Sequence, residues 1–488
     1  MMAFDPHGVD VIGDQIIGGR RVAGAIEQVV RSPSRADVER AIGWASEAQV
    51  DDAVTVAREA WRSSGWGRTA PRDRAAILRR FADLVDAHAD ELARIESLVS
   101  ARIHAEVLAR DVQVVSGVLR YFGEFADKID GAVTPTPDNS FSFTVQEPHG
   151  VVAAIAPWNF PMILASWKFA PALAAGNAVV LKPSEITPFS VARLAELAVE
   201  AGLPAGLFNV VQGDAAVGAA LVRHPGVDYV TFTGSSATGA RIMADAATTG
   251  LKPVSLELGG KGPQLVFDDT PDFDRLAALI ARGITYNAGQ VCFAGSRLVV
   301  QRGIADRLLD AVAERMSDYR IGATWAEGTT MPPIINTRQA ERIDGIVRAG
   351  IADGGEAVCG GGAIDHPDAA FYQPTILRGV PETSRALREE IFGPVLAVQE
   401  FDDVDEGIAL ANHVDYGLTA SVHTADVNRA FHAARNIESG TVWINDWGRR
   451  TDFTAPFGGY KRSGLGKDMG RAGFEKYQKT KAIWVELT

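Results

Sequence analysis

Cysteine is nearly absent from this chain, which has only Cys292 and Cys359 among its 488 residues. Two cysteines do not form the framework of a disulfide-stapled domain, and such scarcity suits a protein of the reducing cytosol. The N-terminal segment carries acidic residues and lacks the apolar core of a secretory signal. We therefore expect a cytoplasmic protein.

Long apolar runs and an excess of basic charge are also missing. The longest apolar stretches, such as VVAAIAP at 151–157, fall well short of the roughly 20 residues that span a membrane. The 48 basic and 61 acidic residues give a net charge of −13. This balance argues against a nucleic acid or a membrane as a partner. A length of 488 residues predicts two or three domains.

Apolar segments and helical patterns alternate from residue 145 onward. Strands without polar interruptions are typical of a parallel sheet that helices cover on both faces. The sequence therefore predicts a doubly wound α/β domain, followed by a second α/β region from about Leu258 to Gly470. The expected strands of the first domain lie within 151–157, 177–184, 206–213, 227–234 and 252–260.

The segments on either side of this core have other patterns. Apolar residues at helical spacing predict helices over 50–63 and 71–98. Residues 130–146 are polar and alternate, which predicts a hairpin that projects from the body. The segment KAIWVEL at 481–487 is a candidate partner strand for this hairpin.

Several loops after the predicted strands carry residues suited to a nucleotide, because ligands of such sheets bind outside the carboxyl ends of the strands. Lys182 and Glu185 match a ribose as donor and acceptor, or form a solvated surface pair. A carboxylate there would repel a 2′-phosphate, which favours NAD over NADP. Gly234 and Ser235 open a helix and suit a pyrophosphate, although Ser235 is equally a plain N-cap. The usual GxGxxG fingerprint is absent from these turns.

Other loops carry candidates for catalysis. Asn159 in PWNFP is a rigid amide that suits an oxyanion, or a turn-stabilising residue. Glu257 ends an apolar strand, where its pKa should rise toward that of a general base. Glu390 and Phe392 in EEIFGP suit a second ribose and a flat heterocycle, or form a simple anchored loop. Cys292 in GQVCFAG is a buried thiol or a nucleophile on a tight loop.

Taken together, these loops have a recognisable order. The succession PWNFP, KPSE, FTGS, ELGGK, GQVC, EEIFGP and PFGGYKRSGLG closely resembles the aldehyde dehydrogenase superfamily, from about residue 15 to the C-terminus. The resemblance implies NAD-dependent oxidation of an aldehyde to a carboxylic acid. It also implies a Rossmann-variant cofactor domain without GxGxxG, an α/β catalytic domain and a β-hairpin arm for oligomerisation.

The resemblance also implies where the domains lie. We place the NAD-binding domain at 1–126 and 147–255, the catalytic domain at 256–469 and the arm at 127–146 and 470–488. Such an arm implies a homodimer or homotetramer. No metal ion is implied.

By the same resemblance, Cys292 is the thiolate that attacks the aldehyde, and Asn159 with the Cys292 N–H holds the oxyanion. Glu257 is the base that activates water to release the acid. Its presence favours hydrolysis over transfer to coenzyme A, because acylating relatives generally lack this glutamate. The expected cofactor contacts are Trp158, Lys182, Glu185, Gly234, Ser235, Glu390 and Phe392, and the expected substrate tunnel consists of Phe160, Leu164, Trp167, Phe293 and Phe453.

The chain departs from the family pattern at three places, none of which belongs to the core catalytic set, and one of them is MPPIIN at 331–336 in place of the more usual Gly-Pro-Leu form. The segment VSARIHA at 99–105 stands where many relatives have a Thr-Gly-Lys-Pro-like stretch. Asp468 stands where a proton-relay glutamate often follows SGLG, with a shorter side chain.

The substrate and the reaction class leave alternatives open. The aromatic tunnel implies an apolar or aromatic aldehyde, whereas Arg449 and Arg450 suit a substrate carboxylate, as in a semialdehyde acid, or form a solvated loop. Outside the family, a thiol hydrolase would pair Cys292 with a histidine such as His149. The sequence does not place His149 near Cys292, and such an enzyme would leave the nucleotide loops without a role.

Overall fold

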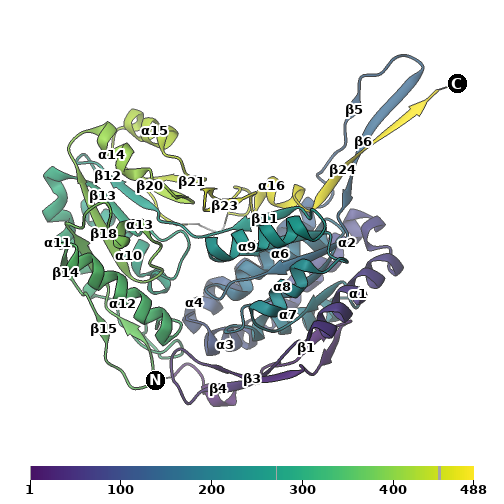
Figure 1. Ribbon diagram of the computed structural model, residues 1–488, viewed down its shortest axis with the longest axis horizontal. Coiled ribbons are helices and arrows are strands. Elements are labelled where there is room, and N and C mark those ends of the chain that lie inside the picture. Colours follow the sequence, from purple (N-terminus) through teal and green to yellow (C-terminus); the bar gives the residue numbers. More distant parts are fainter. Residues whose placement is uncertain (1, 271, 449–451, 488) are drawn as a thin grey trace.

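The computed structural model describes residues 2–270, 272–448 and 452–487. Two large sheets lie in separate lobes, and a long β-ribbon that includes the C-terminal strand projects from the body (Figure 1). Strands and helices alternate as the apolar pattern predicts, so the α/β fold class is confirmed.

The first sheet contains the five strands predicted between residues 151 and 260. Its order is β2-β1-β9-β8-β7-β10-β11-β23, and β9 to β11 run parallel. The chain builds from β7 to β9 on one side and then crosses to β10, so the strand order reverses between β7 and β10. Such a reversal opens a ligand crevice outside the carboxyl ends of the strands. The strands are β1 (Gln15–Ile17), β2 (Arg20–Val22), β7 (Val151–Ile155), β8 (Ala178–Lys182), β9 (Phe208–Val210), β10 (Tyr229–Thr233), β11 (Val254–Glu257) and β23 (Gly464–Leu465).

The second sheet has the order β14-β17-β18-β13-β12-β20-β21 and is parallel except for the edge strand β14. The predicted second α/β region is therefore present. Its strands are β12 (Pro263–Val266), β13 (Arg297–Gln301), β14 (Glu356–Cys359), β17 (Thr375–Arg378), β18 (Val395–Phe401), β20 (Thr419–His423) and β21 (Thr441–Ile444).

Helices and short elements complete the two lobes. The helices are α1 (Glu47–Ser63), α2 (Pro71–Ala87), α3 (Ala89–Val99), α4 (His104–Glu106), α5 (Val112–Phe125), α6 (Pro161–Ala174), α7 (Phe189–Glu200), α8 (Ala215–Arg223), α9 (Ser236–Thr248), α10 (Phe273–Thr285), α11 (Ala305–Ser317), α12 (Thr337–Ala352), α13 (Arg385–Arg388), α14 (Val404–Ala411), α15 (Val427–Asn436) and α16 (Gly470–Glu475). Short helical turns are η1 (Pro6–Gly8), η2 (Trp66–Arg68), the π-helical η3 (Val107–Asp111), η4 (Tyr286–Gly289) and η5 (Arg302–Ile304). Small strand pairs are β3 (Ile26–Arg31) with β4 (Glu39–Trp44), β15 (Ala363–Ile364) with β16 (Phe371–Tyr372), and β19 (Tyr416–Gly417) with β22 (Tyr460–Lys461).

The single helix predicted over 71–98 is wrong, because the structure has two helices that meet at His88. His88 has φ −101° and ψ 23°, outside the helical range. Its Nδ1 atom lies 2.6 Å from Glu91 Oε2. Asp90 and Glu91 then fall in the first turn of α3, where the helix dipole favours acidic side chains.

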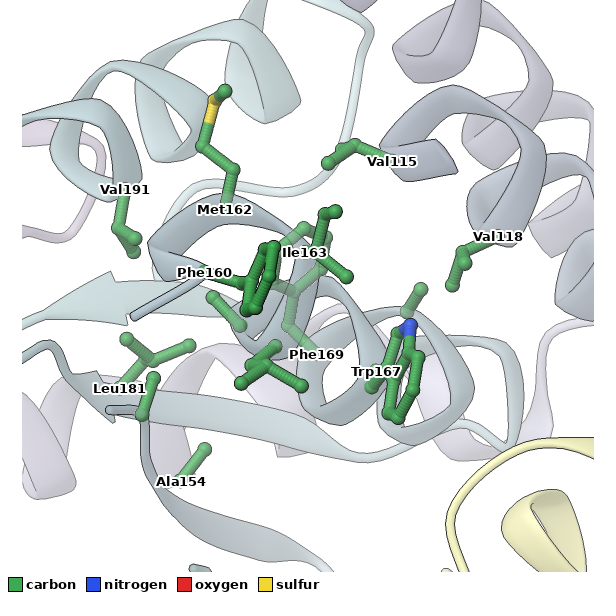
Figure 2. Packing of buried hydrophobic residues seen from close by; sticks show 14 of the residues in the cluster. Val115, Val118, Ala154, Phe160, Met162, Ile163, Trp167, Phe169, Leu181 and Val191 are labelled. Carbon is green, nitrogen blue, oxygen red and sulfur yellow. The ribbon is translucent and has the colours of Figure 1, made fainter. Parts of the chain in front are cut away.

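Helix α6 is the most deeply buried helix near the reversal point of the first sheet. Its 14 residues are all buried, as expected for a helix that is apolar on every side. It lies between α5, which carries Val115 and Val118, and the strands that carry Ala154 and Leu181 (Figure 2). The loop that precedes α6 is therefore held between two packed elements.

The projecting ribbon is a three-stranded sheet. Strand β24 (Gln478–Glu486) pairs antiparallel with the full length of β6 (Ser140–Pro148), and β5 (Val133–Thr134) pairs with the other edge of β6. The predicted hairpin and its C-terminal partner strand are thus confirmed. No helix in the described ranges is long and apolar enough to cross a bilayer.

Candidate active site

Cys292 lies where two cavities meet. One, of about 280 Å³, opens at the carboxyl ends of β7 and β10, where Trp158 and Gly234 line it. The other, of about 50 Å³, is lined largely by apolar side chains from α5, α6 and later loops. Cys292 and Leu164 line both cavities. The thiol therefore faces a polar chamber and an apolar one at the same time.

The loop before Cys292, residues 286–292, has an unusual backbone. Three consecutive residues are left-handed, with φ of 51° at Asn287, 52° at Ala288 and 71° at Gly289. A side chain at Gly289 would collide with the backbone of Gly393, so this position requires glycine. Left-handed conformations at non-glycine residues persist only where surrounding contacts hold them. We call this segment the nucleophile loop.

Gln290 supplies part of that support. Its side-chain amide donates to the carbonyls of Asn287 and Pro333, both at 3.1 Å. Its side-chain oxygen accepts from the Ile335 N–H at 2.8 Å. The Gln290 side chain is fully buried, so these bonds hold the nucleophile loop against the segment that contains Pro333 and Ile335.

Asn159 holds the same loop from the other lobe. Its side-chain amide donates to the carbonyl of Gln290 at 3.0 Å, and its own carbonyl accepts from the Asn287 side chain at 3.3 Å. The residue is buried and lines the larger cavity beside Cys292. A side-chain amide carries two N–H groups, so one is oriented by Gln290 while the second is available to a reacting oxygen.

The surroundings of Cys292 oppose its ionisation. Burial raises the pKa of the thiol, and the carboxylates of Glu390 and Glu257 raise it further. The backbone N–H groups of Phe293 and Cys292 act in the opposite direction. A reactive thiolate at this position therefore requires positive charge brought close to the sulfur.

Glu257 ends β11 and is buried. Its carboxylate lies so close to Gly458 that a side chain there would collide with it. Burial raises the pKa of Glu257 well above its ordinary value, and the Asp468 carboxylate raises it further. The ammonium groups of Lys476 and Lys168 lower this pKa, but by less than burial and Asp468 raise it. A carboxyl group whose pKa is raised in this way is suited to accept a proton near neutral pH.

Asp468, a candidate proton-relay carboxylate in the sequence, is buried beside two lysines. It forms an ion pair with Lys476, and its Oδ2 atom lies 3.7 Å from Lys168 Nζ. All three groups are almost fully buried. Two ammonium groups thus lie against this buried carboxylate and offset its negative charge.

Five of the seven residues predicted to contact a cofactor line the larger cavity: Trp158, Gly234, Ser235, Glu390 and Phe392. Ser235 also caps α9, accepting the Thr238 N–H at 3.3 Å. Glu390 accepts the Gly260 N–H at 2.9 Å. Burial raises the pKa of Glu390 to about 7, although the Gly260 amide lowers it. The rings of Phe392 and Trp158 meet edge to face at 5.2 Å.

The remaining two predicted cofactor residues lie beside this cavity and do not line it. Lys182 and Glu185 follow β8, next to β7 in the sheet, and their charged groups are 3.6 Å apart. Lys182 is buried and also donates to the carbonyl of Pro183 at 3.0 Å. The structure therefore contains the Lys–Glu pair, and a role at a ribose remains a prediction.

The smaller cavity contains all five residues predicted for the substrate tunnel, Phe160, Leu164, Trp167, Phe293 and Phe453. Six further lining residues had no signal in the sequence: Arg110, Val114, Ile163, Asp452, Phe457 and Met469. Several rings pack against one another, since Phe293 lies 5.5 Å from Trp447 and 6.2 Å from Phe457. The cavity thus offers aromatic edges and faces to a flat apolar group.

Residues 23–483 of the chain match the model of the aldehyde dehydrogenase family. The chain belongs to the aldehyde dehydrogenase family. The expectation from the ordered loops is thereby confirmed, and the enzyme acts on aldehyde groups.

Solved structures of similar proteins agree with this assignment. An indole-3-acetaldehyde dehydrogenase from P. syringae, whose structure contains NAD+ and IAA, is 39% identical with a TM-score of 0.97, and 100% of each chain is covered. A gamma-glutamyl-gamma-aminobutyraldehyde dehydrogenase from Burkholderia cenocepacia is 40% identical with a TM-score of 0.96, covering 99% of this chain and 98% of that one. A betaine aldehyde dehydrogenase from Staphylococcus aureus, in complex with NAD+, is 36% identical with a TM-score of 0.95, covering 98% and 95%.

Some residues of this aldehyde dehydrogenase site were missed or lie elsewhere. Gln339 and Arg342 of α12 line the larger cavity, and Arg342 donates to the carbonyl of Glu390 at 2.6 Å. They lie on a long helix without a local signal for ligand binding. His149 stacks on Tyr229 at 4.8 Å and lines neither cavity at Cys292.

Two predicted features need separate mention. Arg449 and Arg450, the candidates for a substrate carboxylate, lie outside the described residues. In the ranges 2–270, 272–448 and 452–487, no cluster of three or more His, Cys, Asp or Glu side chains is arranged to hold a metal ion.

Proposed function

We propose that this aldehyde dehydrogenase oxidises apolar, aromatic aldehydes with NAD and releases the carboxylic acid through a covalent intermediate on Cys292. The observation that carries the proposal is the position of Cys292 at the junction of the two cavities. An aldehyde in the apolar cavity reaches the sulfur from one side, and a nucleotide in the larger cavity reaches the same point from the other.

The larger cavity fits NAD on several counts. It lies at the strand reversal of the first sheet, and Ser235 at the start of α9 presents backbone N–H groups to a pyrophosphate. Glu390 and Phe392 match a ribose and the nicotinamide ring. Lys182 and Glu185, beside the cavity, match the second ribose, and the Glu185 carboxylate disfavours a 2′-phosphate. NAD is therefore the expected cofactor over NADP.

The residues at the junction account for the acylation half of the reaction. When bound, nicotinamide supplies the hydride acceptor and a positive charge that favours the thiolate. Cys292 Sγ attacks the carbonyl carbon, and the resulting oxyanion takes the second N–H of Asn159 and the N–H of Cys292. Loss of hydride from this adduct leaves a thioester on the sulfur.

Glu257 accounts for the second half. Its carboxylate takes a proton from water, and the resulting hydroxide attacks the thioester carbonyl. The carbon–sulfur bond then breaks, the acid leaves and Cys292 returns as a thiolate. Lys168 and Lys476 near Glu257 and Asp468 balance the negative charge of this region.

The apolar cavity supports an aromatic aldehyde as substrate. Phe160, Trp167, Phe293 and Phe453 line the smaller cavity, which also reaches Cys292. Burying a flat apolar group among them is favourable by about 25 cal/mol per Å² of apolar surface removed from water. The name of the indole-3-acetaldehyde dehydrogenase relative is consistent with such a substrate.

A panel of aldehydes tests the proposal. NADH formation is followed with aromatic, aliphatic and carboxylated aldehydes, in parallel with NAD and NADP. We expect the highest kcat/KM for aromatic aldehydes with NAD, and no turnover in Cys292→Ala, which should still bind NAD. A preference for carboxylated aldehydes would overturn the substrate class, and turnover by Cys292→Ala would overturn the mechanism.

A further inference from the structure

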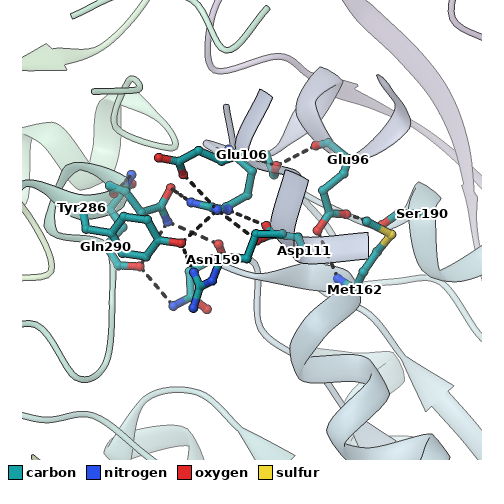
Figure 3. A network of polar contacts seen from close by, with 12 residues as sticks. Glu96, Glu106, Asp111, Asn159, Met162, Ser190, Tyr286 and Gln290 are labelled. Carbon is teal, nitrogen blue, oxygen red and sulfur yellow. Dashed lines mark hydrogen bonds and ion pairs between the residues drawn. The ribbon is translucent and has the colours of Figure 1, made fainter. Parts of the chain in front are cut away.

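Arg102 lies in the segment 99–105 that departs from the family pattern, and its side chain is completely buried. It forms a two-pronged ion pair with Asp111, with Nε to Oδ2 at 2.8 Å and Nη2 to Oδ1 at 3.1 Å. Asp111 ends the π-helical turn η3 and is also fully buried. Figure 3 shows Asp111 within a network of polar contacts that also contains Tyr286, Asn159 and Gln290. A buried ion pair ordinarily stabilises the fold. The contacts of Arg102 with residues other than Asp111 therefore decide whether it also has a role in catalysis.

Those contacts lead directly to the nucleophile loop. Nη1 of Arg102 donates to Asn287 Oδ1 at 3.3 Å, and Nη2 donates to the hydroxyl of Tyr286 at 3.1 Å. The guanidinium carbon lies 4.5 Å from the ring centroid of Phe160 and 5.2 Å from that of Tyr286. One side chain thus touches the start of the loop and a wall of the substrate cavity.

Asn287 links Arg102 to Asn159, the residue proposed to hold the oxyanion. While its oxygen accepts from Arg102, its amide donates to the carbonyl of Asn159 at 3.3 Å and to that of Gln290 at 3.4 Å. Because Arg102 donates to the oxygen, it fixes which end of the Asn287 amide faces Asn159. The same residue begins the left-handed stretch, with φ of 51°.

We propose that Arg102 is a positioning residue for catalysis, which acts through Asn287 to hold the nucleophile loop and Asn159 in their reactive arrangement. The proposal rests on the proposed function of Cys292 and Asn159. A planar guanidinium binds the Asp111 carboxylate with one edge and still reaches Asn287 and Tyr286 with its remaining N–H groups. A lysine ammonium at this position keeps the positive charge beside Asp111 and Glu106 but lacks the planar fork of N–H groups that also reaches Asn287 and Tyr286.

The test uses variants that separate an effect on the position of the nucleophile loop from an effect on the stability of the fold. Arg102→Lys keeps a positive charge opposite Asp111 and removes the reach to Asn287. The combined variant Arg102→Met with Asp111→Leu and Glu106→Gln removes all three charges, because Glu106 Oε2 also lies 3.0 Å from Arg102 Nη2 and must not be left as an unpaired carboxylate. Asn287→Gly removes the intermediate side chain, and glycine adopts the positive φ without strain. Arg74→Lys is the matched control, because Arg74 is a buried arginine that donates to the carbonyl of Ala174, outside this network.

For each folded variant we measure the melting temperature and the kcat and KM for aldehyde and NAD. We expect Arg102→Lys and Asn287→Gly each to lower kcat by about 10- to 100-fold, less than the full loss of an oxyanion donor, with KM changed by less than about threefold. Because both act on one contact, Arg102→Lys combined with Asn287→Gly should be no slower than Asn287→Gly alone.

Other outcomes separate the two proposals. Additive effects of Arg102→Lys and Asn287→Gly, or kcat within about twofold of the unmodified enzyme in both Arg102 variants, would overturn the positioning role. An equal loss in Arg74→Lys would show that the effect is general destabilisation, which also overturns it. Turnover by Cys292→Ala in the same assay would instead reject the proposed function itself.

Discussion

Glu257 combines burial with a carboxylate oxygen that is not satisfied by the protein. Its Oε2 atom accepts no hydrogen bond from any residue in the described part of the chain. Burial and the nearby Asp468 raise the pKa of Glu257 well above 4.5, its ordinary value. The group must be deprotonated to accept a proton from water. The acidic limb of the kcat–pH profile should therefore lie well above pH 4.5.

Glu257→Gln removes the base while preserving the size of the side chain. We expect deacylation to slow by about 10²- to 10⁴-fold, the usual contribution of a general base. The thioester on Cys292 should then accumulate, and mass spectrometry of enzyme quenched during turnover should detect the added acyl mass. The acidic limb assigned to Glu257 should disappear from the remaining activity. Unchanged turnover without an acyl adduct would reject Glu257 as the base.

At the scale of the elements, Glu96 joins three helices. It lies on α3, accepts the Met162 N–H at the start of α6 at 3.1 Å, and accepts the Ser190 hydroxyl of α7 at 2.5 Å. Burial raises the pKa of Glu96 to about 7, although the Ser190 and Met162 hydrogen bonds lower it (Figure 3). The folded protein thus binds a proton at Glu96 that the unfolded chain releases at lower pH.

The pH dependence of stability that follows from this difference in proton binding has a defined sign. Between pH 4.5 and about 7 the folded state holds the Glu96 proton and the unfolded state does not, so stability falls as the pH rises through this window. Glu96→Gln carries no proton to lose. We therefore expect the variant to match the unmodified protein at low pH and to exceed its free energy of unfolding by about 3 kcal/mol above the window.

Denaturant unfolding at both ends of the window measures this difference. The control is Glu91→Gln on the same helix. Burial raises the pKa of Glu91, but the hydrogen bonds from Arg193 and His88 outweigh it and lower the pKa overall. Since Glu91 is stabilising in its charged form, Glu91→Gln should lose stability at high pH, which is the opposite sign. A Glu96→Gln variant with the same pH dependence as the unmodified protein would contradict the assignment.

The parts of the site that the sequence predicts are those at strand ends. Uninterrupted apolar runs predict the parallel strands, and the residues that follow them, such as Asn159 and Gly234, come together because carboxyl ends of parallel strands share one edge. Glu257 at the end of β11 is predictable for the same reason, whereas Cys292 precedes β13 and is predicted from the scarcity of cysteine and the glycines of its loop. A strand and the loop that follows it are defined by neighbouring residues, so both can be recognised in the sequence without knowledge of the packing.

Other contributions depend on contacts between distant segments. Arg342 of α12 reaches the Glu390 loop, and Arg102 reaches Asn287 across 185 residues of chain. A buried arginine has no local pattern, because its environment is made by elements that are far away in the sequence. The break at His88 was missed because the apolar spacing continues through it, whereas the backbone of His88, with φ −101° and ψ 23°, leaves the helical range.

At the scale of the whole molecule, the projecting ribbon exposes apolar residues. In the register of β24 against β6, Phe141 lies opposite Val485 and Phe143 opposite Ile483, so all four share one face. Phe141 is 41% exposed and Val485 39% exposed. Strand β24 is also an edge strand of nine residues, which leaves backbone groups available for pairing.

We therefore expect this face of the ribbon to mediate a homodimer or homotetramer, and light scattering during size-exclusion chromatography measures the outcome. Phe141→Lys combined with Val485→Lys places two charges on the face and should produce smaller particles, because desolvating unpaired charges at a contact is unfavourable. Leu251→Lys is the control, since Leu251 is 84% exposed and lies away from the ribbon, after α9. A monomeric unmodified protein, or a double variant of unchanged mass, would show that the apolar face does not hold the assembly together. Within the described part of the chain, the residues that line the two cavities at Cys292 lie outside the ribbon, so we expect the smaller particles to retain aldehyde oxidation.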